Sequence, residues 1–260
     1  MLDPSQYTPD RSLAAKVKRR LTYWRTAKAM SHTPARGIVS FTFDDFPKSA
    51  AQHGADILES RDARGTYYAC TGMRSKTNIM GEMYDQSDLE RLRLAGHEIG
   101  AHTFSHLDCS RVNMATLRDE IDRNMEDLGA FLSGGDVANF AWPYGETTYE
   151  NKLTVSKYVS TARGILPGIN RKGSDLMQLG AFELTPSPAS TDRAVKAIEK
   201  TARRGGWAII FTHDVRDEPS PFGVQPDALK RLLKCAKDAG VSVLPVSEAF
   251  AQIQSGTSVQ

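Results

Sequence analysis

The sequence predicts an α/β protein in which helical crossovers join parallel strands, either closed into a barrel or wound as an open sheet. Short β-branched or aromatic runs alternate with helical stretches along most of the chain. Polar residues able to do chemistry follow several of these runs, as is typical of the carboxyl ends of parallel strands. The 260 residues, 40% hydrophobic and 25% charged, suffice for one large core.

Eight segments have the pattern of strands. The first, 37–43, alternates and is rich in β-branched and aromatic residues before it stops at Asp44 and Asp45. The others are 65–69, 98–102, 137–141, 159–161, 182–184, 207–211 and 241–244. A glycine-rich loop at 164–180 separates two of them.

Helices are expected between these strands. Ser87 and Glu90 have the spacing of a capping box, which predicts a helix that begins at Ser87. In 116–132, Leu117, Ile121 and Leu128 recur on one helical face. Further helices are expected at 50–61, 192–203 and 227–239.

Residues 1–36 are expected to form a basic extension before a domain at 37–260. Positions 11–36 hold eight cationic side chains and no acidic one, and four large apolar residues recur at helical spacing: Leu13, Val17, Leu21 and Trp24. This helix can pack its apolar stripe on the domain. Alternatively, residues 11–30 can make a peripheral contact with an anionic membrane.

Composition and missing motifs exclude several classes of protein. A formal net charge of +2 does not indicate nucleic-acid binding, and three widely spaced cysteines predict neither a disulfide framework nor a thiolate metal site. No glycine-rich nucleotide-binding fingerprint occurs at a strand-to-helix turn. Because no signal peptide or stretch of about 18 apolar residues occurs, we expect a cytoplasmic protein, with membrane association only through the basic helix.

Two histidines four residues apart indicate a metal site. If the chain turns helical after His102, His102 and His106 share one face and can bind one ion. A carboxylate beside two imidazoles suits zinc, and either Asp44 or Asp45 can supply it. The alternative, two core histidines beside an aspartate pair, is costly to bury without an ion.

Other reactive groups are expected close to these histidines, because the carboxyl ends of parallel strands meet at one edge of the sheet. The groups that follow expected strands are Asp44–Asp45, His102, Pro143–Tyr144 and His213. Metal-assisted hydrolysis needs a base, which the unliganded aspartate can supply. His213 can protonate the leaving group, and backbone N–H groups near Tyr144 can stabilise an oxyanion.

These residues resemble the motifs of the polysaccharide deacetylases with NodB homology, a carbohydrate esterase family. The sequence TFDD at 42–45 resembles the first motif, HTFSH at 102–106 the second, and FTH at 211–213 the last. The resemblance spans roughly residues 37–249. It implies a single-domain, distorted (β/α) barrel of about seven strands, one divalent metal ion, most often zinc, and removal of acetyl groups from an N-acetylated or O-acetylated glycan.

The resemblance also implies roles for individual residues. By it, the metal ligands are Asp45, His102 and His106, the base is Asp44, the acid is His213, and the Tyr144 amide belongs to the oxyanion hole. Trp142, Pro143 and Arg163 are candidates for substrate binding. Trp142 can stack on a sugar ring or simply line the core.

Two family features are missing. The third motif commonly has an arginine two positions before its proline, where this chain has Ala141, and no D-x-x-D-W motif is present. A similar arginine-less sequence occurs in members that act on poly-N-acetylglucosamine, so the change can mark a subgroup. Arg163 can replace the missing cation and Asp175 can orient His213; surface salt bridges are the alternative for both.

Three other functions stay open at this point. One is hydrolysis of a small amide or cyclic ureide, because the metal chemistry is similar. A glycan-binding pseudoenzyme is another, since two family features are missing. A mononuclear iron oxygenase also uses two histidines and a carboxylate. For a deacetylase, the expected substrate is a glycan or a lipid-linked sugar.

Overall fold

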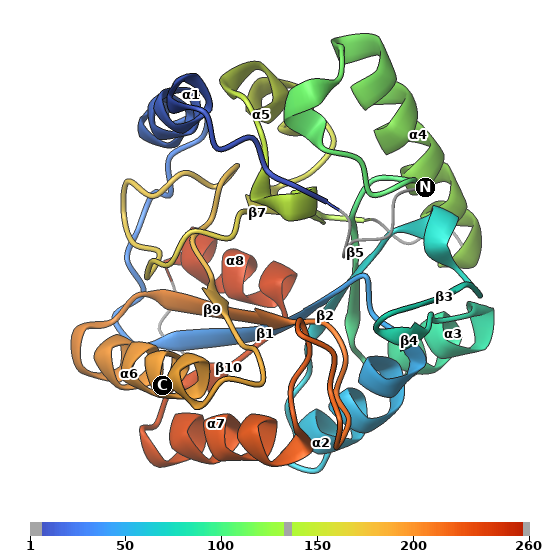
Figure 1. Ribbon diagram of the computed structural model, residues 1–260. Helices are drawn as coiled ribbons and strands as arrows, with labels where there is room; N and C mark the ends of the chain where they lie inside the picture. Colours follow the sequence, from blue (N-terminus) through green and yellow to red (C-terminus); the bar gives the residue numbers. More distant parts are fainter. Residues whose placement is uncertain (1–6, 133–136, 257–260) are drawn as a thin grey trace.

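The centre of the molecule is one curled sheet in which all pairings are parallel (Figure 1). The structure is a computed structural model that describes residues 7–132 and 137–256. Seven strands follow one another in the order β7-β6-β5-β2-β1-β9-β8, and β10 pairs with the start of β1. The bounds are β1 Ile38–Asp44, β2 Thr66–Ala69, β5 Glu98–Ala101, β6 Asn139–Ala141, β7 Thr161–Arg163, β8 Phe182–Glu183, β9 Trp207–Thr212 and β10 Ser242–Val243. The expected α/β barrel fold of about seven strands is confirmed.

The longest strand, β1, lies inside the sheet between β2 and β9. All seven of its residues are buried, because neighbouring strands flank it and side chains cover both faces. Phe43 stacks on Tyr67 of β2 with ring centroids 4.6 Å apart. The aspartate pair at the end of β1 therefore stands on a rigid support.

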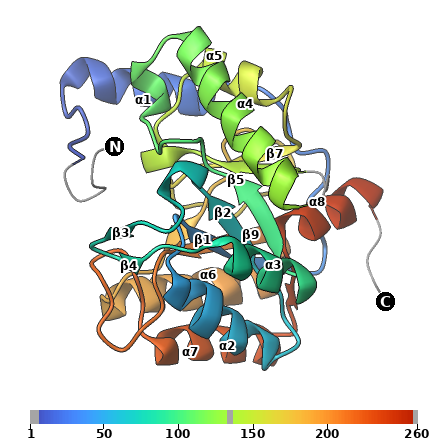
Figure 2. The same cartoon turned by 90° about the vertical axis from the view of Figure 1, so that its right-hand side faces the viewer.

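Helices lie around the outside of the sheet (Figure 2). Their bounds are α1 Leu13–Trp24, α2 Ala55–Glu59, α3 Gln86–Leu94, α4 Met114–Phe131, α5 Tyr149–Val155, α6 Pro188–Arg204, α7 Pro226–Asp238 and α8 Val246–Ser255. Figures 1 and 2 both place α1 beside α5, at the end of the molecule opposite α6 and α7. A short hairpin of β3 (Thr77–Asn78) and β4 (Gly81–Glu82) completes the fold with the turns η2 Ala50–Gly54, η3 Thr71–Met73, η4 Cys109–Arg111 and η5 Pro143–Gly145.

Several boundaries differ from the sequence-based expectation. Helix α3 is capped by Asp85, whose side chain accepts from the Ser87 and Asp88 amides, so the capping box is Asp85 with Asp88. Strand β7 begins where the expected strand 159–161 ends. Helices α5 and α8 were not expected, because α5 is too short for a clear helical repeat and α8 follows Pro245 directly.

Helix α1 does not pack its apolar stripe on the domain. Leu13, Val17 and Leu21 are 79%, 52% and 53% exposed, and Thr22 is the only buried residue of the helix. The Lys152 ammonium, itself fully buried, holds the end of the helix by donating to the carbonyl oxygens of Thr22 and Arg25, each at 2.7 Å. The packing alternative for this stripe is therefore wrong. Among residues 7–132 and 137–256, no helix is long and apolar enough to cross a bilayer.

Candidate functional site

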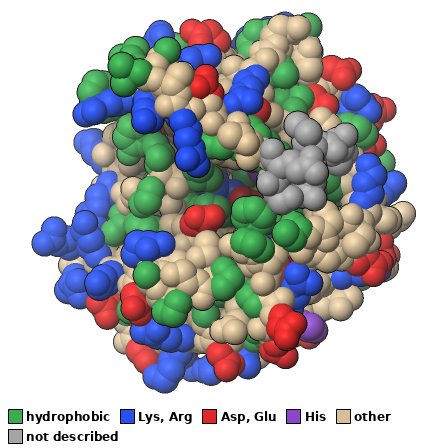
Figure 3. All heavy atoms as spheres, in the orientation of Figure 1, with side chains coloured by type: hydrophobic (Ala, Val, Ile, Leu, Met, Phe, Trp, Pro, Cys, Tyr) green, Lys and Arg blue, Asp and Glu red, His purple; other side chains and the backbone are tan. Residues whose placement is uncertain are grey.

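A cavity of about 170 Å³ opens where the carboxyl ends of several strands meet. Its lining residues are Asp44, Asp45, Met80, His102, His106, Trp142, Tyr144, Ile165, Glu183, Phe211, His213 and Phe222. Figure 3 shows a hollow near the centre of this face of the molecule. The fold thus brings together the aspartate pair, both histidines of the second motif, Trp142, Tyr144 and His213, as expected for the mouth of a parallel sheet.

Asp45, His102 and His106 form a compact group of potential metal ligands. One donor atom from each lies within 4.8 Å of the others, and all three side chains are buried. His106 Nε2 lies 2.8 Å from Asp45 Oδ2, and His102 Nε2 lies 3.9 Å from Asp45 Oδ1. These are two imidazoles and one carboxylate, a set that binds zinc and leaves a position open for a reactant.

The two histidines lie on a loop, so the helical turn that would place both rings on one face does not form. Thr103 and His106 both have positive φ, 59° and 57°, and this turns the chain so that the two rings lie 4.9 Å apart. A non-glycine residue rarely adopts such a backbone, and residues that do are concentrated at functional sites. Asp45 (φ 43°) and Tyr144 (φ 58°) share this conformation, so four of the six described non-glycine residues with positive φ belong to the site.

Two buried polar residues of helix α4 hold the loop of residues 102–106, called the histidine loop. Asn124 Oδ1 accepts from the His102 amide at 3.1 Å, and the Glu120 carboxylate accepts from the Ser105 amide and hydroxyl, both at 2.7 Å. Neither residue was identified from the sequence. The signal was present, because both interrupt the apolar face of α4 that Ile121 and Leu128 define.

Hydrogen bonding sets the tautomer of His102. Its Nδ1–H donates to the Ala141 carbonyl at 2.8 Å, which leaves Nε2 unprotonated and directed at Asp45. Burial lowers the pKa of His102 to about 4, so the ring is neutral at physiological pH, as a metal ligand must be. Burial would raise the pKa of Asp45, but His106 and His102 outweigh that effect and hold it below its usual value.

Buried polar atoms without a hydrogen-bond partner also indicate that this donor set suits a divalent ion. Asp45 Oδ1 and His106 Nδ1 are buried and make no hydrogen bond with the described residues. An unpartnered carboxylate oxygen in a buried site is costly unless a cation or solvent satisfies it. Because Asp45 Oδ1 lies on the side of His102 Nε2, an ion bound by both would satisfy it.

Arg163 at the end of β7 forms a buried ion pair with Asp44. Its guanidinium donates to Asp44 Oδ2 and, at 2.9 Å, to the Gly164 carbonyl, and the side chain is fully buried. Ala141 on β6 is the register partner of Arg163, so both side chains leave the sheet in the same direction. The cation expected near position 141 is therefore supplied by the neighbouring strand. This burial places Arg163 under the pocket and beside the aspartate rather than at a substrate surface.

His213 is oriented by a backbone carbonyl. Its Nδ1–H donates to the Phe222 carbonyl at 3.2 Å, which directs Nε2 away from that loop. Asp214 is buried and accepts from the Ser220 amide at 2.8 Å and from Arg216 Nε at 2.9 Å, so it holds the loop in place. Asp175 is not the partner of His213, because it binds the Lys152 ammonium and the amides of residues 27 and 28.

The turn η5 carries the aromatic part of the rim. Tyr144 packs edge-on against His106, with centroids 4.4 Å apart, and Tyr7 stacks on Tyr144 at 3.6 Å. The Tyr7 hydroxyl donates to Asp108 at 2.7 Å and fixes the stack. Trp142 is 1% exposed and donates its indole N–H to the Met177 carbonyl, so only part of its ring reaches the cavity. Pro143 is buried at the start of the turn.

Comparisons with known proteins place this chain among polysaccharide deacetylases. The family model described as polysaccharide deacetylase matches residues 31–161. A chitin deacetylase of Arthroderma benhamiae is 25% identical over 224 residues, which cover 84% of this chain and 53% of that protein. A chitin deacetylase of Colletotrichum lindemuthianum is 32% identical over 108 residues, 42% of each chain. The chain thus spans about half the length of these curated relatives, or less.

Solved structures share the fold at low sequence identity. The structure of the Colletotrichum lindemuthianum chitin deacetylase has a TM-score of 0.60 at 18% identity, covering 86% of this chain and 92% of that one. A CE4 family pseudoenzyme from Bacillus anthracis has a TM-score of 0.55 at 16% identity, covering 84% and 66%. With the family model matching half of its length, and with the motif residues gathered in one cavity, this chain belongs to the polysaccharide deacetylase family.

Proposed function

We propose that this protein is a metal-dependent hydrolase that removes acetyl groups from a glycan. The observation that carries the proposal is the buried group of Asp45, His102 and His106 in the same cavity as Asp44 and His213. Membership of the family and the similarity to two chitin deacetylases support a glycan substrate.

Zinc is the ion that suits the proposed ligand set best, because two imidazoles and one carboxylate match its preferences. Asp45, His102 and His106 would hold it. When bound, the ion supplies a Lewis acid for the acetyl carbonyl and lowers the pKa of a bound water. The remaining steps belong to the side chains of this chain.

Asp44 is the proposed general base. Its Oδ1 is buried and makes no hydrogen bond with the described residues, so it can accept a proton from the attacking water. The other oxygen is engaged by Arg163, which holds the carboxylate in one orientation. As the water oxygen bonds to the acetyl carbon, the proposed donor to the developing oxyanion is the Tyr144 amide.

His213 is the proposed general acid. Its Nδ1–H is engaged by the Phe222 carbonyl, so Nε2 is the nitrogen that can deliver a proton to the cavity. As the carbon–nitrogen or carbon–oxygen bond breaks, the imidazolium protonates the departing amine or alcohol. The products are acetate and the deacetylated sugar.

The substrate class follows from the relatives. The two curated relatives reported above are chitin deacetylases, and a third, from Arthroderma benhamiae, is a probable peptidoglycan-N-acetylglucosamine deacetylase, 29% identical over 101 residues. All three names indicate an N-acetylated sugar, so this is the preferred substrate. The sugar can be part of a free glycan or be carried on a lipid.

Two substitutions separate the proposed roles. Asp44→Asn should lower turnover of acetylated chito-oligosaccharides by about 10³-fold and keep the bound metal, because the base is not a ligand. His102→Ala should lose the metal, measured by plasma mass spectrometry. Asp62→Asn, the same substitution at a fully exposed aspartate, is the control and should change neither quantity. Near-normal turnover by Asp44→Asn contradicts the proposal.

A glycan-binding pseudoenzyme is the competing function, because one structural neighbour is a CE4 family pseudoenzyme. Binding of an acetylated oligosaccharide without release of acetate, by protein loaded with zinc, would favour it. A substrate panel that includes small amides and cyclic ureides tests the remaining hydrolase alternative. Release of acetate from oligosaccharides alone would exclude it.

A further inference from the structure

Helix α1 packs on the domain with its polar side and directs its apolar side outward. Thr22, its buried residue, follows Leu13 by nine positions, which places the two side chains on opposite sides of a helix. Besides Leu13, Val17 and Leu21, Trp24 is 63% exposed on this outer side. We call Leu13, Val17, Leu21 and Trp24 the apolar stripe.

The inner side of α1 is held by polar contacts. Arg19 Nε donates to both carboxylate oxygens of Glu146, at 2.7 and 2.9 Å, and Lys152 binds the carbonyl oxygens of Thr22 and Arg25. These contacts fix the rotation of the helix about its axis. The outward direction of the apolar stripe is therefore built into the fold, and a change in the stripe leaves these anchors intact.

Cationic side chains border the apolar stripe on both sides. At helical spacing, Lys16 and Arg20 lie along one border and Lys18 along the other, and the Arg20 guanidinium lies 4.7 Å from the centre of the Trp24 ring. No carboxylate of residues 7–132 or 137–256 forms an ion pair with any of these three side chains. Figure 3 shows Lys and Arg side chains gathered on the side of this face where α1 lies.

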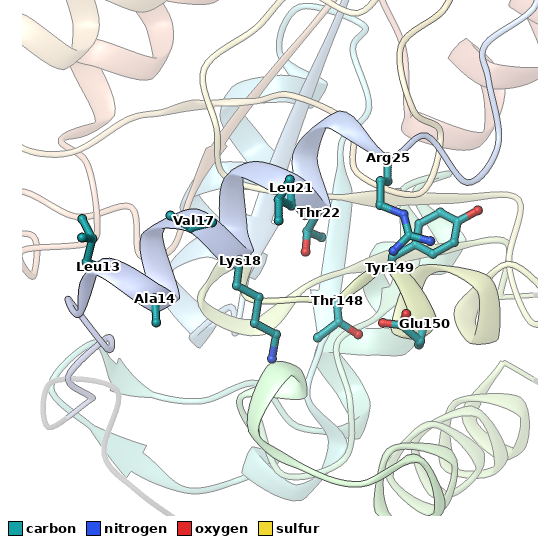
Figure 4. A pocket seen from close by; sticks show the side chains of 10 residues that line it. All are labelled: Leu13, Ala14, Val17, Lys18, Leu21, Thr22, Arg25, Thr148, Tyr149 and Glu150. Carbon is teal, nitrogen blue, oxygen red and sulfur yellow. The ribbon is translucent and has the colours of Figure 1, made fainter.

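A groove of about 520 Å³ runs along the stripe, between α1 and the start of α5 (Figure 4). In Figure 4, Lys18 and Arg25 extend from α1 toward Thr148 and Tyr149. Glu150 is the one acidic residue in its lining, against those two cations. The groove is therefore apolar along α1 with a net positive rim.

We propose that the apolar stripe of α1 docks on the surface of an anionic phospholipid bilayer. A helix with an apolar face bordered by lysine and arginine lies in the interface between lipid head groups and acyl chains. An exposed tryptophan suits the head-group level, and Lys16, Lys18 and Arg20 along the borders of the apolar stripe complement anionic lipid. A second copy of this chain is a poor partner, because two-fold pairing of the stripe would bring two cationic borders together.

Docking would place the catalytic cavity near the membrane. Glu146, which holds α1, is two residues from Tyr144 on the rim, and Tyr7, which precedes α1, stacks on Tyr144. The helix is thus attached to the rim itself. This inference does not depend on the reaction catalysed, so it can fail or succeed independently of the proposed function.

Tryptophan fluorescence tests the docking directly. Trp142 and Trp207 are 1% and 0% exposed, so Trp24 is the one tryptophan that can enter a membrane. With vesicles of 70% phosphatidylcholine and 30% phosphatidylglycerol, we expect a blue shift and protection from acrylamide quenching, both absent with phosphatidylcholine alone. Trp24→Phe should remove the signal. An unchanged spectrum on anionic vesicles overturns the proposal.

Vesicle sedimentation with matched variants provides the second test. Val17→Gln/Leu21→Gln and Lys16→Glu/Lys18→Glu should each lower the vesicle-bound fraction at least fivefold. Their controls are Leu94→Gln, at a leucine 71% exposed on α3, and Lys196→Glu/Lys200→Glu on the exposed side of α6, which should bind like the wild type. Activity on soluble oligosaccharides should be the same in all variants.

Two outcomes would overturn the assignment of the apolar stripe to a membrane. Equal loss of binding in the Leu94→Gln control would show that sedimentation reports general adhesion. A dimer in light scattering that disappears in Val17→Gln/Leu21→Gln, without vesicle binding by the wild type, would show that a second copy covers the stripe. Either result overturns the membrane proposal.

Discussion

The Arg163 guanidinium and the Asp44 carboxylate form a buried ion pair between the ends of β7 and β1. In sequence the two residues are 119 positions apart, and the arginine occupies the register position next to Ala141. Arg163 thus offers Asp44 a cation from the strand adjacent to Ala141, since register partners on parallel strands point to the same side of the sheet. The pair links the proposed base to the frame of the sheet.

Replacing Arg163 should separate its role in catalysis from its role in stability. In Arg163→Met the Asp44 carboxylate is left buried and unpaired, which should cost about 3–5 kcal/mol of unfolding free energy, measured by urea denaturation. We expect kcat to fall about 10²-fold or more with little change in KM, because this side chain is fully buried and does not line the cavity.

Two further variants give that prediction its controls. Arg163→Met/Asp44→Asn should regain most of the lost stability, because the buried charge is gone, and should stay inactive. Arg163→Lys keeps the positive charge but loses the planar guanidinium with its paired N–H donors, so its kcat should lie between those of Arg163→Met and the wild type. Full activity in Arg163→Met would show that Asp44 needs no cation to act.

Metal binding should depend on the support beneath the histidine loop. Asn124→Ala removes the acceptor for the His102 amide and should weaken zinc affinity about 10–100-fold in a competition titration. Asn113→Ala is the control on the same helix: it removes the N-cap of α4 and should cost about 1 kcal/mol of stability without changing zinc affinity. Equal zinc affinity in both variants would contradict a positioning role for Asn124.

Chelation should abolish deacetylation, and added zinc should restore it under anaerobic conditions. This follows because the proposed reaction is a hydrolysis and consumes no oxidant. The measurement is release of acetate by apo and reloaded protein in a sealed cell. Turnover that requires iron and dioxygen would instead support the oxygenase alternative.

The loop that orients His213 should be sensitive to a single methyl group. A Cβ on Gly223 would overlap the Asp214 carboxylate, so Gly223→Ala must displace the loop that carries the Phe222 carbonyl. We expect kcat to fall about tenfold with the metal retained. Gly129→Ala on α4, where a Cβ would meet no heavy atom within 4 Å, should keep kcat and gain up to about 1 kcal/mol in stability.

The stabilising contribution of the buried His97 should be lost in mild acid. Its Nδ1 accepts from the Gly65 amide at 3.0 Å and its Nε2–H donates to Glu59 at 3.1 Å, so the buried ring is neutral. Burial lowers its pKa below 6.5. As the pH falls, the unfolded chain therefore takes up a proton on His97 at a higher pH than the folded chain does. This contribution to stability is present above pH 6.5 and declines as the pH falls toward the pKa of the folded state.

The test for His97 compares unfolding free energies at pH 7.5 and pH 5. His97→Gln should be less stable than the wild type at pH 7.5, and the difference should shrink at pH 5. His32→Gln, at an exposed histidine, is the control and should follow the wild type at both values. A wild-type protein that gains stability relative to His97→Gln in acid would contradict a buried ring that is kept neutral.

Much of the fold could be predicted from the sequence because its signals are local. The alternation of strands and helices predicts a parallel sheet, and a parallel sheet brings the ends of its strands to one edge. Asp44, Asp45, His102 and His213 follow strand ends, so their meeting in one cavity needed no knowledge of distant contacts. Helices α5 and α8 lacked such a signal, since α5 has only seven residues and α8 follows Pro245 directly.

The sequence by itself therefore determined the parallel sheet, the edge at which its strand ends meet and the residue types gathered at that edge. Only the tertiary structure decided that Arg163 reaches Asp44, that the Phe222 carbonyl orients His213, and that Asp175 binds Lys152. Each of these contacts joins residues whose spacing carries no periodic signal, because register and loop closure place them. The tertiary structure also decided which way the apolar stripe of α1 faces. Helical periodicity defines the stripe, but the contacts with Lys152 and Glu146 turn it outward.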